Sequence, residues 1–514
     1  MPLHEPGDAH GAPCFVDIVN RNHKVRLVSL RIYPQIGATG AVFNTVGCMT
    51  YQNKLFLAGS FVDASDGGTF DVTNPRDGSV ITSVASATEE DVKKAFDAAC
   101  EAQEVWAKTS PRYRADILWR AYEEIMERKD EIAELMTLEL GRALPGSQGE
   151  SVYGAEFFRW FAAEAERMSG DYRLAPTGNA RIVEVQQPVG PVLAITPWNF
   201  PLAMGTRKLG PALAAGCTVV LKPASKTPLT MLLLAEILDH AGLDKGVVSI
   251  LPCSSAALEP LYSDSRLRKL TFTGSTAVGK ELAAKVPTAR VSLELGGNAP
   301  FVVLSDADLT TAVEAASTAK MRGAGQVCIA ANRFIVHRDL HADFVAKVTE
   351  SLKGSEYGPL SGDDQVEKVT ELVQDAVDQG AELVWQDEVP EKGSWFPLTI
   401  LDNVPTSARM YKEEIFGPVV AVYEAASDEE AIAMANDTNF GLAGYLFSAD
   451  LQHALDSAEK LEVGMVGVNK GGISDAAAPF GGVKDSGLGR EGGFQGIEEF
   501  LERKLISLPA PADK

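Results

Sequence analysis

The chain has 514 residues, with 47 basic and 70 acidic side chains and a formal net charge of −23. This negative balance argues against broad binding to nucleic acid or to an anionic membrane, because both require positive charge facing phosphates. No segment approaches the about 20 apolar residues of a membrane-spanning helix. A chain of this length exceeds a single hydrophobic core, so we expect about two or three domains.

Residues 1–48 carry no sustained helical or alternating pattern and no apolar signal core. We expect a poorly ordered N-terminal extension there, with Met49 as a possible functional start. The six cysteines are scattered along the chain. Their spacing indicates reduced thiols in a cytoplasmic protein and not a disulfide framework.

Two helical runs follow the extension. Thr88 and Asp91 form a candidate capping box at the start of the first run. Ser110 and Pro111 are typical of a second helix start, and Gly141 ends that run. The apolar stripes of these helices are typical of packing faces, and we assign them no chemistry.

Short β-rich runs alternate with helical segments between residues 191 and 294, which predicts a parallel sheet covered by helices. The predicted strands are 192–196, 217–222, 247–251, 269–272 and 290–294. The ligand crevice of such a sheet lies at the carboxyl ends of its strands. A second α/β unit is predicted from strand 300–304 to strand 463–469, with helices beginning near residues 309, 340, 365, 428 and 450. Segments 166–187 and 480–508 read as strands outside both units.

Cys328 lies in the stretch MRGAGQVCIAANR, where small residues let the backbone approach closely just before the thiol. We interpret Cys328 as a nucleophile at the buried start of a helix, where free N–H groups favour a thiolate. A buried structural cysteine is the alternative. His337 and His341 have no cluster of ligands beside them, so we expect no metal site but a strand end followed by a solvated helix start.

Several motifs accompany this cysteine in a fixed order. They are PWNF (197–200), LKPAS (221–225), FTGST (272–276), LELGG (293–297), EEIFGPV (413–419) and PFGGVKDSGLGRE (479–491). As a set they resemble the aldehyde dehydrogenase superfamily from about Leu55 to Leu508. The resemblance implies an α/β fold with a Rossmann-type cofactor domain, an α/β catalytic domain and a β-arm that pairs with a neighbouring subunit in a homodimer or homotetramer. The implied domains are 49–165 with 188–297 for NAD(P) binding, 298–479 for catalysis, and 166–187 with 480–508 for oligomerisation.

The resemblance also implies a role for each motif. Cys328 attacks an aldehyde, Asn199 donates to the resulting oxyanion, and Glu294 is the general base for hydrolysis of the thioester to a carboxylic acid. The residues implied to bind the cofactor are Thr196, Trp198, Lys222, Ser225, Gly274, Ser275, Glu414 and Phe416. Gly274 and Ser275 open a helix directly after a strand, where free N–H groups can face a pyrophosphate; a turn glycine is the alternative. Ser225 stands where relatives that prefer NAD often carry a carboxylate, so we expect NADP to be preferred and NAD to be possible.

Within the superfamily, segments 206–217, 462–474 and 486–504 resemble succinate-semialdehyde dehydrogenases. Arg207, Arg322 and Ser474 occupy the positions that bind the substrate carboxylate there, and arginine suits that task because its fork binds carboxylate in two places. Ala330 replaces a second cysteine common in these relatives, which excludes a disulfide switch in this loop. Glutarate or oxoglutarate semialdehyde as substrate, a catalytically silent scaffold and a thiol esterase remain alternatives.

Overall fold

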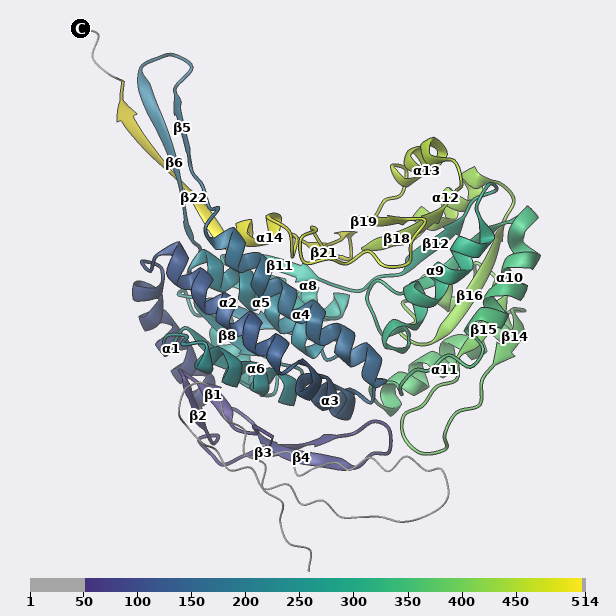
Figure 1. Cartoon of the computed structure of the whole chain (residues 1–514), viewed down its shortest axis with the longest axis horizontal. Coiled ribbons are helices and arrows are strands. Elements are labelled where there is room, and N and C mark those ends of the chain that lie inside the picture. Colours follow the sequence, from purple (N-terminus) through teal and green to yellow (C-terminus); the bar gives the residue numbers. More distant parts are fainter. Residues whose placement is uncertain (1–50, 511–514) are drawn as a thin grey trace, which may run out of the picture. The chain divides into compact units, whose positions relative to one another are not determined.

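A computed structural model of the chain describes residues 51–510, so the expected extension 1–48 lies outside the described residues. The first sheet has eight strands in the order β2-β1-β9-β8-β7-β10-β11-β21 (Figure 1). Its strands are β1 (Leu55–Leu57), β2 (Ser60–Val62), β7 (Val192–Ile195), β8 (Val219–Lys222), β9 (Val248–Ile250), β10 (Lys269–Thr273), β11 (Arg290–Glu294) and β21 (Gly487–Leu488). All five predicted strands are confirmed, and they run parallel to one another.

Helices pack around this sheet. They are α1 (Glu89–Trp106), α2 (Pro111–Glu127), α3 (Lys129–Leu140), α4 (Leu144–Ala165), α5 (Pro201–Ala215), α6 (Leu229–His240), η1 (Ala256–Leu258), α7 (Glu259–Tyr262) and α8 (Thr276–Lys285). The capping box is confirmed: the Asp91 N–H donates to Thr88 Oγ1 at 3.2 Å, and the Thr88 N–H donates to Asp91 Oδ2 at 3.0 Å. The run that Gly141 ends is not one helix, because Arg128 leaves helical geometry (φ −98°, ψ 14°) and divides it into α2 and α3.

The second sheet has seven strands in the order β14-β15-β16-β13-β12-β18-β19. Its strands are β12 (Ala299–Val303), β13 (Ala331–His337), β14 (Glu382–Gln386), β15 (Thr399–Asp402), β16 (Val419–Ala425), β18 (Ala443–Phe447) and β19 (Met465–Val468). The helices of this unit are α9 (Leu309–Met321), η2 (Arg322–Gly325), α10 (Arg338–Leu352), α11 (Asp363–Asp378), η3 (Arg409–Tyr411), α12 (Asp428–Asn436) and α13 (Leu451–Ala458). Each predicted helix of the second unit is present within two residues of its expected start.

A separate antiparallel sheet joins two distant segments, in the order β22-β6-β5 (Figure 1). Its strands are β5 (Asp171–Leu174), β6 (Ala180–Pro188) and β22 (Leu501–Pro509). The expectation that 480–508 lies wholly in this arm is wrong. β21 pairs with β11 in the first sheet, β20 (Val483–Lys484) pairs with β17 (Phe440–Gly441), and α14 (Gln495–Glu498) precedes β22. A further hairpin is formed by β3 (Thr69–Thr73) and β4 (Val80–Ala85).

His337 ends β13 and His341 lies in the first turns of α10, as the sequence predicts. The start of the helix is solvated as expected, since Arg338 and Asp339 are exposed, but His341 is buried and its Nε2 lies 2.6 Å from Asp402 Oδ1. Within residues 51–510 we find neither a helix able to cross a membrane nor a group of three or more potential metal-ligating side chains.

Candidate active site

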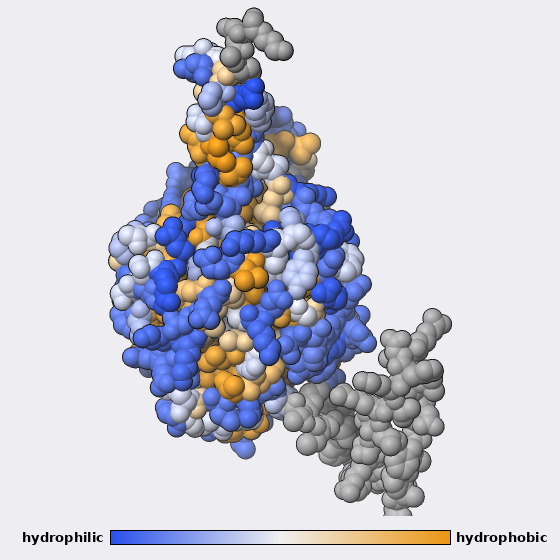
Figure 2. Space-filling model, turned by 90° about the vertical axis from the view of Figure 1, so that its left-hand side faces the viewer, coloured by the Kyte–Doolittle hydropathy of each residue, from blue (hydrophilic) through white to orange (hydrophobic). Residues whose placement is uncertain are grey.

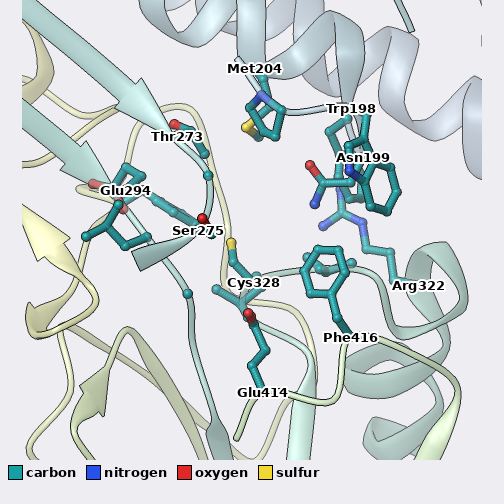
Figure 3. A pocket seen from close by; sticks show the side chains of 18 of the residues that line it. Trp198, Asn199, Met204, Thr273, Ser275, Glu294, Arg322, Cys328, Glu414 and Phe416 are labelled. Carbon is teal, nitrogen blue, oxygen red and sulfur yellow. The ribbon is translucent and has the colours of Figure 1, made fainter. Parts of the chain in front are cut away.

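Residues from both α/β units line a cavity of about 240 Å³ (Figure 3). Asn199, Gly274 and Glu294 reach it from the carboxyl ends of strands of the first sheet, which is where ligand crevices lie in such sheets. Arg322 and Cys328 reach it from the segment that connects α9 to β13 in the second unit. The fold therefore brings residues that are far apart in the sequence to one cavity.

Cys328 lies in a turn between η2 and β13, so the expectation that it begins a helix is wrong. The turn approaches its surroundings closely: a Cβ atom on Gly325, which has φ +74°, would lie 2.2 Å from the carbonyl oxygen of Gly417. Burial raises the pKa of the Cys328 thiol to about 12, and the carboxylate of Glu414 adds to this shift. The resting group is therefore a neutral thiol, whose sulfur faces the cavity (Figure 3).

Asn199 follows β7 and is 7 % exposed. Its side-chain Nδ2 donates to the main-chain oxygen of Gln326 at 2.9 Å, while Oδ1 has no hydrogen-bond partner within the described chain. One of the two Nδ2 hydrogens remains available, because an amide group carries two. The arrangement leaves a donor beside the Cys328 loop.

Glu294 ends β11 and is 3 % exposed. Burial and the neighbouring carboxylate of Glu491 hold the pKa of Glu294 well above its usual range, while Lys208 and Arg207 oppose that shift. Lys208 Nζ lies 2.6 Å from Glu491 Oε1, so this second carboxylate is paired. Glu294 Oε2 is buried without a partner among residues 51–510, as a group awaiting a water or a proton would be.

The predicted cofactor residues fall into two groups. Trp198, Gly274, Ser275, Glu414 and Phe416 line the main cavity, whereas Lys222, Ser225 and Thr196 do not. Ser275 is the N-cap residue of α8 but its side chain makes no capping bond. Glu414 Oε1 accepts from the Gly297 N–H at 3.0 Å, and burial raises the pKa of Glu414 to about 7.

The three predicted cofactor residues outside the main cavity lie at or just after the carboxyl ends of the neighbouring strands β7 and β8. Thr196 directly follows β7, and its buried hydroxyl has no partner in the described residues. Lys222 is the last residue of β8, and its Nζ donates to Pro223 O at 3.3 Å. Ser225 lines a neighbouring cavity of about 210 Å³ together with Lys226 and Trp198, and Trp198 also lines the main cavity.

Of the predicted substrate residues, Arg207 and Arg322 line the main cavity and Ser474 does not. Arg207 is 2 % exposed, with its guanidinium 4.2 Å from the ring centre of Phe480. It donates to the hydroxyl groups of Tyr153 and Ser474, and Ser474 also hydrogen bonds to Tyr153. Ser474 itself lines a second cavity, of about 530 Å³, on the far side of Tyr153.

Arg322 is packed between aromatic rings, with its guanidinium 4.7 Å from the ring centre of Phe200 and 5.4 Å from that of Tyr153. It makes no hydrogen bond and no ion pair with any residue of the described chain. Arg322 is half-buried and lines the cavity, so an anion bound in the cavity could pair with its charge while partly excluded from water. Figure 3 shows Arg322 and Asn199 at the same side of the cavity.

Sequence reasoning missed several residues of the site. Tyr153 lies on α4, in a helix without a motif, and no sequence signal marked it. Lys208 and Glu491 were within quoted motifs but received no role. A lysine inside the fully buried helix α5 was a usable signal, because a buried charge requires a partner.

The aldehyde dehydrogenase family model matches residues 61–506. The chain belongs to this aldehyde dehydrogenase family. It is 48% identical to a succinate-semialdehyde dehydrogenase of Paenarthrobacter nicotinovorans, over 84% of this chain and 99% of that protein. It is 44% identical to a glutarate-semialdehyde dehydrogenase of Pseudomonas aeruginosa, over 89% of this chain and 98% of that protein.

Solved structures agree with the family assignment. A crystal structure described as an NADP dependent enzyme of E. coli superposes with a TM-score of 0.88 at 43% identity, covering 89% of this chain and 98% of that one. A succinate-semialdehyde dehydrogenase of Burkholderia pseudomallei gives a TM-score of 0.88 at 41% identity, covering 90% and 100%. The α/β fold expected for an aldehyde dehydrogenase is therefore confirmed, and the protein is an oxidoreductase of that family.

Proposed function

We propose that this aldehyde dehydrogenase oxidises succinate semialdehyde, or a similarly short aldehyde acid, to the corresponding dicarboxylic acid. The observation that carries the proposal is Arg322, an unpaired cation in the cavity that holds Cys328. A substrate with a carboxylate at the end remote from its aldehyde supplies the missing anion. Arg207 and Ser474 support the same reading, since both offer donors beside Tyr153.

The side chains of the cavity have complementary tasks in this reaction. Cys328 rests as a thiol, so a base must take its proton as the sulfur attacks the aldehyde carbon. Glu294 is the candidate base, because its raised pKa gives its carboxylate form a high proton affinity and one of its oxygens has no hydrogen-bond partner in residues 51–510. The free Nδ2 hydrogen of Asn199 can donate to the oxyanion that forms on the former aldehyde oxygen. Once Glu294 has released that proton to solvent, its carboxylate can take a proton from the water that hydrolyses the thioester.

Features of the main cavity support binding of part of a nicotinamide dinucleotide there. The α8 N-terminus offers N–H groups that the Ser275 side chain does not cap, and the buried hydroxyl of Thr273 beside it has no partner in residues 51–510. In this proposal Glu414 and Phe416, which line the main cavity, hold a ribose and pack against the nicotinamide, and Lys222, at the end of the neighbouring strand β8, holds the other ribose. When bound, the dinucleotide supplies a hydride acceptor.

The proposed cofactor preference is for NADP over NAD. Ser225 places no carboxylate in its cavity position, and Lys226 is near, although its Nζ is engaged by Asp364 Oδ1 at 3.1 Å. A relative from E. coli K12, 43% identical, carries NADP(+) in its name. We expect kcat/KM with NADP to exceed that with NAD, and a Ser225→Glu variant to reverse the order. A wild-type preference for NAD of about tenfold or more would overturn this interpretation.

The substrate proposal is tested by comparing succinate semialdehyde with butanal, which has the same number of carbon atoms and no carboxylate. Arg322→Ala and Arg207→Ala should each lower kcat/KM for succinate semialdehyde by about 30-fold or more, and that for butanal much less. Arg112→Ala, at an exposed position on α2, is the control and should change neither. Equal losses with both aldehydes would show that the arginines do not recognise a carboxylate. The same assay with glutarate semialdehyde measures the preferred chain length.

The arm supports a second proposal, that two copies of the chain associate through it. Large apolar side chains are exposed on its strands, among them Tyr172 (62 %), Leu174 (58 %) and Leu505 (65 %). Figure 2 shows an apolar region on the narrow part of the surface. Exposed apolar patches of this kind favour a protein partner. Sedimentation should give a dimer or tetramer, Leu505→Lys should weaken it, and a monomeric wild type would contradict the proposal.

A further inference from the structure

A buried ion pair lies behind the PWNF turn and takes no direct part in the chemistry described above. Arg142, just before α4, and Glu150, in the second turn of α4, are 8 % and 1 % exposed. Arg142 Nη1 lies 2.5 Å from Glu150 Oε2. Helix α4 packs along α5, which carries Arg207 and Lys208 (Figure 1).

Glu150 supplies the N-terminal cap that α5 lacks. The N-cap residue of α5 is Phe200, whose side chain cannot accept a hydrogen bond. Instead the N–H groups of Leu202 and Ala203 donate to Glu150 Oε1 at 3.0 and 3.2 Å. A carboxylate at this place satisfies two free donors and interacts favourably with the helix dipole. The start of α5, directly after Asn199, is therefore fixed by a residue of another helix.

Arg142 extends this contact to Asn199 itself. Its Nη2 donates to the main-chain oxygen of Asn199, and its guanidinium lies 4.3 Å from the ring centre of Phe200. The planar fork thus holds Glu150 with one arm and Asn199 with the other. The side chain of Asn199 has one hydrogen bond of its own, to Gln326 O, so its direction depends strongly on where its main chain is held.

Stability alone does not account for this pair. A buried ion pair contributes little net free energy of folding, because its desolvation cost offsets its attraction. Catalytic donors, however, must be held within about 0.5 Å of their productive place. The contacts of Arg142 and Glu150 converge on the main chain at either side of Pro201 and so satisfy that need.

We propose that Arg142 and Glu150 are positioning residues that hold the Asn199 amide where it meets the oxyanion on the Cys328 adduct. The inference rests on the role proposed for Asn199 and not on recognition of a substrate carboxylate. It therefore predicts equal losses for charged and uncharged aldehydes when either residue is changed.

A double-mutant cycle with Asn199→Ala tests the proposal in the full-length enzyme. Asn199→Ala should lower kcat by about 100-fold, the usual cost of one oxyanion donor. Arg142→Lys keeps the charge but loses the fork, and should lower kcat by about tenfold or more with both succinate semialdehyde and butanal. In the Asn199→Ala background the same change should have less than about a twofold effect, because the group it positions is gone. Glu150→Gln keeps an oxygen for the two N–H groups but loses the charge that pairs with Arg142. Like Arg142→Lys, it should lower kcat in the wild-type background and have little effect in the Asn199→Ala background.

The outcomes separate the two ideas. If Asn199→Ala leaves kcat unchanged, the role of Asn199 fails. The positioning role fails if Asn199→Ala lowers kcat but Arg142→Lys and Glu150→Gln lower kcat by the same factor with and without Asn199. It also fails if these two changes leave kcat unaltered in both backgrounds. Arg114→Lys is the matched control: this buried arginine donates to a carbonyl oxygen at the other end of α5, and its replacement should lower the unfolding temperature without changing kcat. The same thermal unfolding measurement checks that each variant is folded.

Discussion

Helix α5 is anchored at each end by a buried arginine that donates to main-chain carbonyl oxygens. At its carboxyl end, Arg114 Nε donates to Ala214 O at 2.9 Å and Nη1 donates to Thr109 O at 2.6 Å. At its amino end, Arg142 donates to Asn199 O and pairs with Glu150. The two ends use the same physical contact, yet they differ in what surrounds it.

Around the carboxyl end, the Gln103 amide finds partners within the protein, although Trp106 Nε1 has none among residues 51–510. Gln103 Nε2 donates to Gly216 O at 2.8 Å, and Gln103 Oε1 accepts from the Thr218 N–H at 2.9 Å. Near the amino end and along the following turns, buried polar atoms without partners in the described residues accumulate. Asn199 Oδ1 and Glu294 Oε2 are two of them, and Arg207 Nε and Glu491 Oε2 also lack a hydrogen bond but form an ion pair with each other at 3.6 Å.

Unpaired buried polar atoms cost free energy, so their concentration at one end of a helix requires a compensating function. A substrate, an oxyanion or a hydrolytic water can supply the missing partners during the reaction. The carboxyl end of α5 is built for stability, whereas the amino end is built for groups that the protein itself does not provide.

The largest expected effect comes from Glu294→Gln, at the functional end. Loss of a general base should lower kcat by about 10²- to 10⁴-fold. Folding should not suffer, because the change removes a buried carboxylate that has an unpartnered oxygen. Steady-state kinetics and thermal unfolding of the same preparation measure both quantities. A Glu294→Gln variant that loses stability but keeps kcat would show that this residue serves folding and not the reaction.

The raised pKa of Glu294 also makes the stability of the protein depend on pH. The pKa of Glu294 is raised in the folded protein, so its contribution is fully present below the ordinary carboxyl pKa of about 4.3 and is lost as pH rises through the raised value. The wild type should therefore lose more stability than Glu294→Gln as the pH rises above the ordinary carboxyl range.

Arg114→Met, at the carboxyl end of α5, should lower stability and leave kcat unchanged. The carbonyl oxygens of Ala214 and Thr109 would stay buried without their donor, at a cost of about 1–3 kcal/mol each. Urea unfolding should report that loss, while kcat should stay within about twofold of the wild type. A fall in kcat at unchanged stability would show that the carboxyl end also serves the reaction.

The sequence was sufficient to predict the regular parts of the fold. The five parallel strands of the first sheet were predictable because short β-branched runs buried on both sides leave few other structures open. Helix starts with a capping residue, such as Thr88, were predictable for the same local reason. The break at Arg128 was not, because its cause is partly a tertiary ion pair with Glu236.

The site residues were predicted from motifs. What the motifs did not predict was the local backbone at Cys328 and the contacts between residues far apart in the sequence. The cavity gathers Cys328, Glu294 and Asn199 as the resemblance implied, but no pattern in the sequence indicated that Cys328 lies in a turn before a strand. Nor could sequence spacing reveal that Arg142 and Glu150 act at the PWNF turn, since their contacts join segments 52 to 57 positions apart. Contacts of this kind depend on the packing of α4 against α5.

The smallest effect on kcat is expected from Glu491→Gln, which keeps the size of the side chain but leaves the buried Lys208 and Arg207 without their negative partner and should therefore lower stability. The negative charge of Glu491 raises the pKa of Glu294, so its removal should lower that pKa. Lys208 and Arg207, which face Glu491 from α5, would then act on Glu294 without opposition, in the same direction. Because a general base works in its deprotonated form, the acidic limb of the kcat profile should move to lower pH. An acidic limb that moves to higher pH, or stays in place while Glu294→Gln abolishes it, would mean that Glu491 does not control the proton affinity of the base.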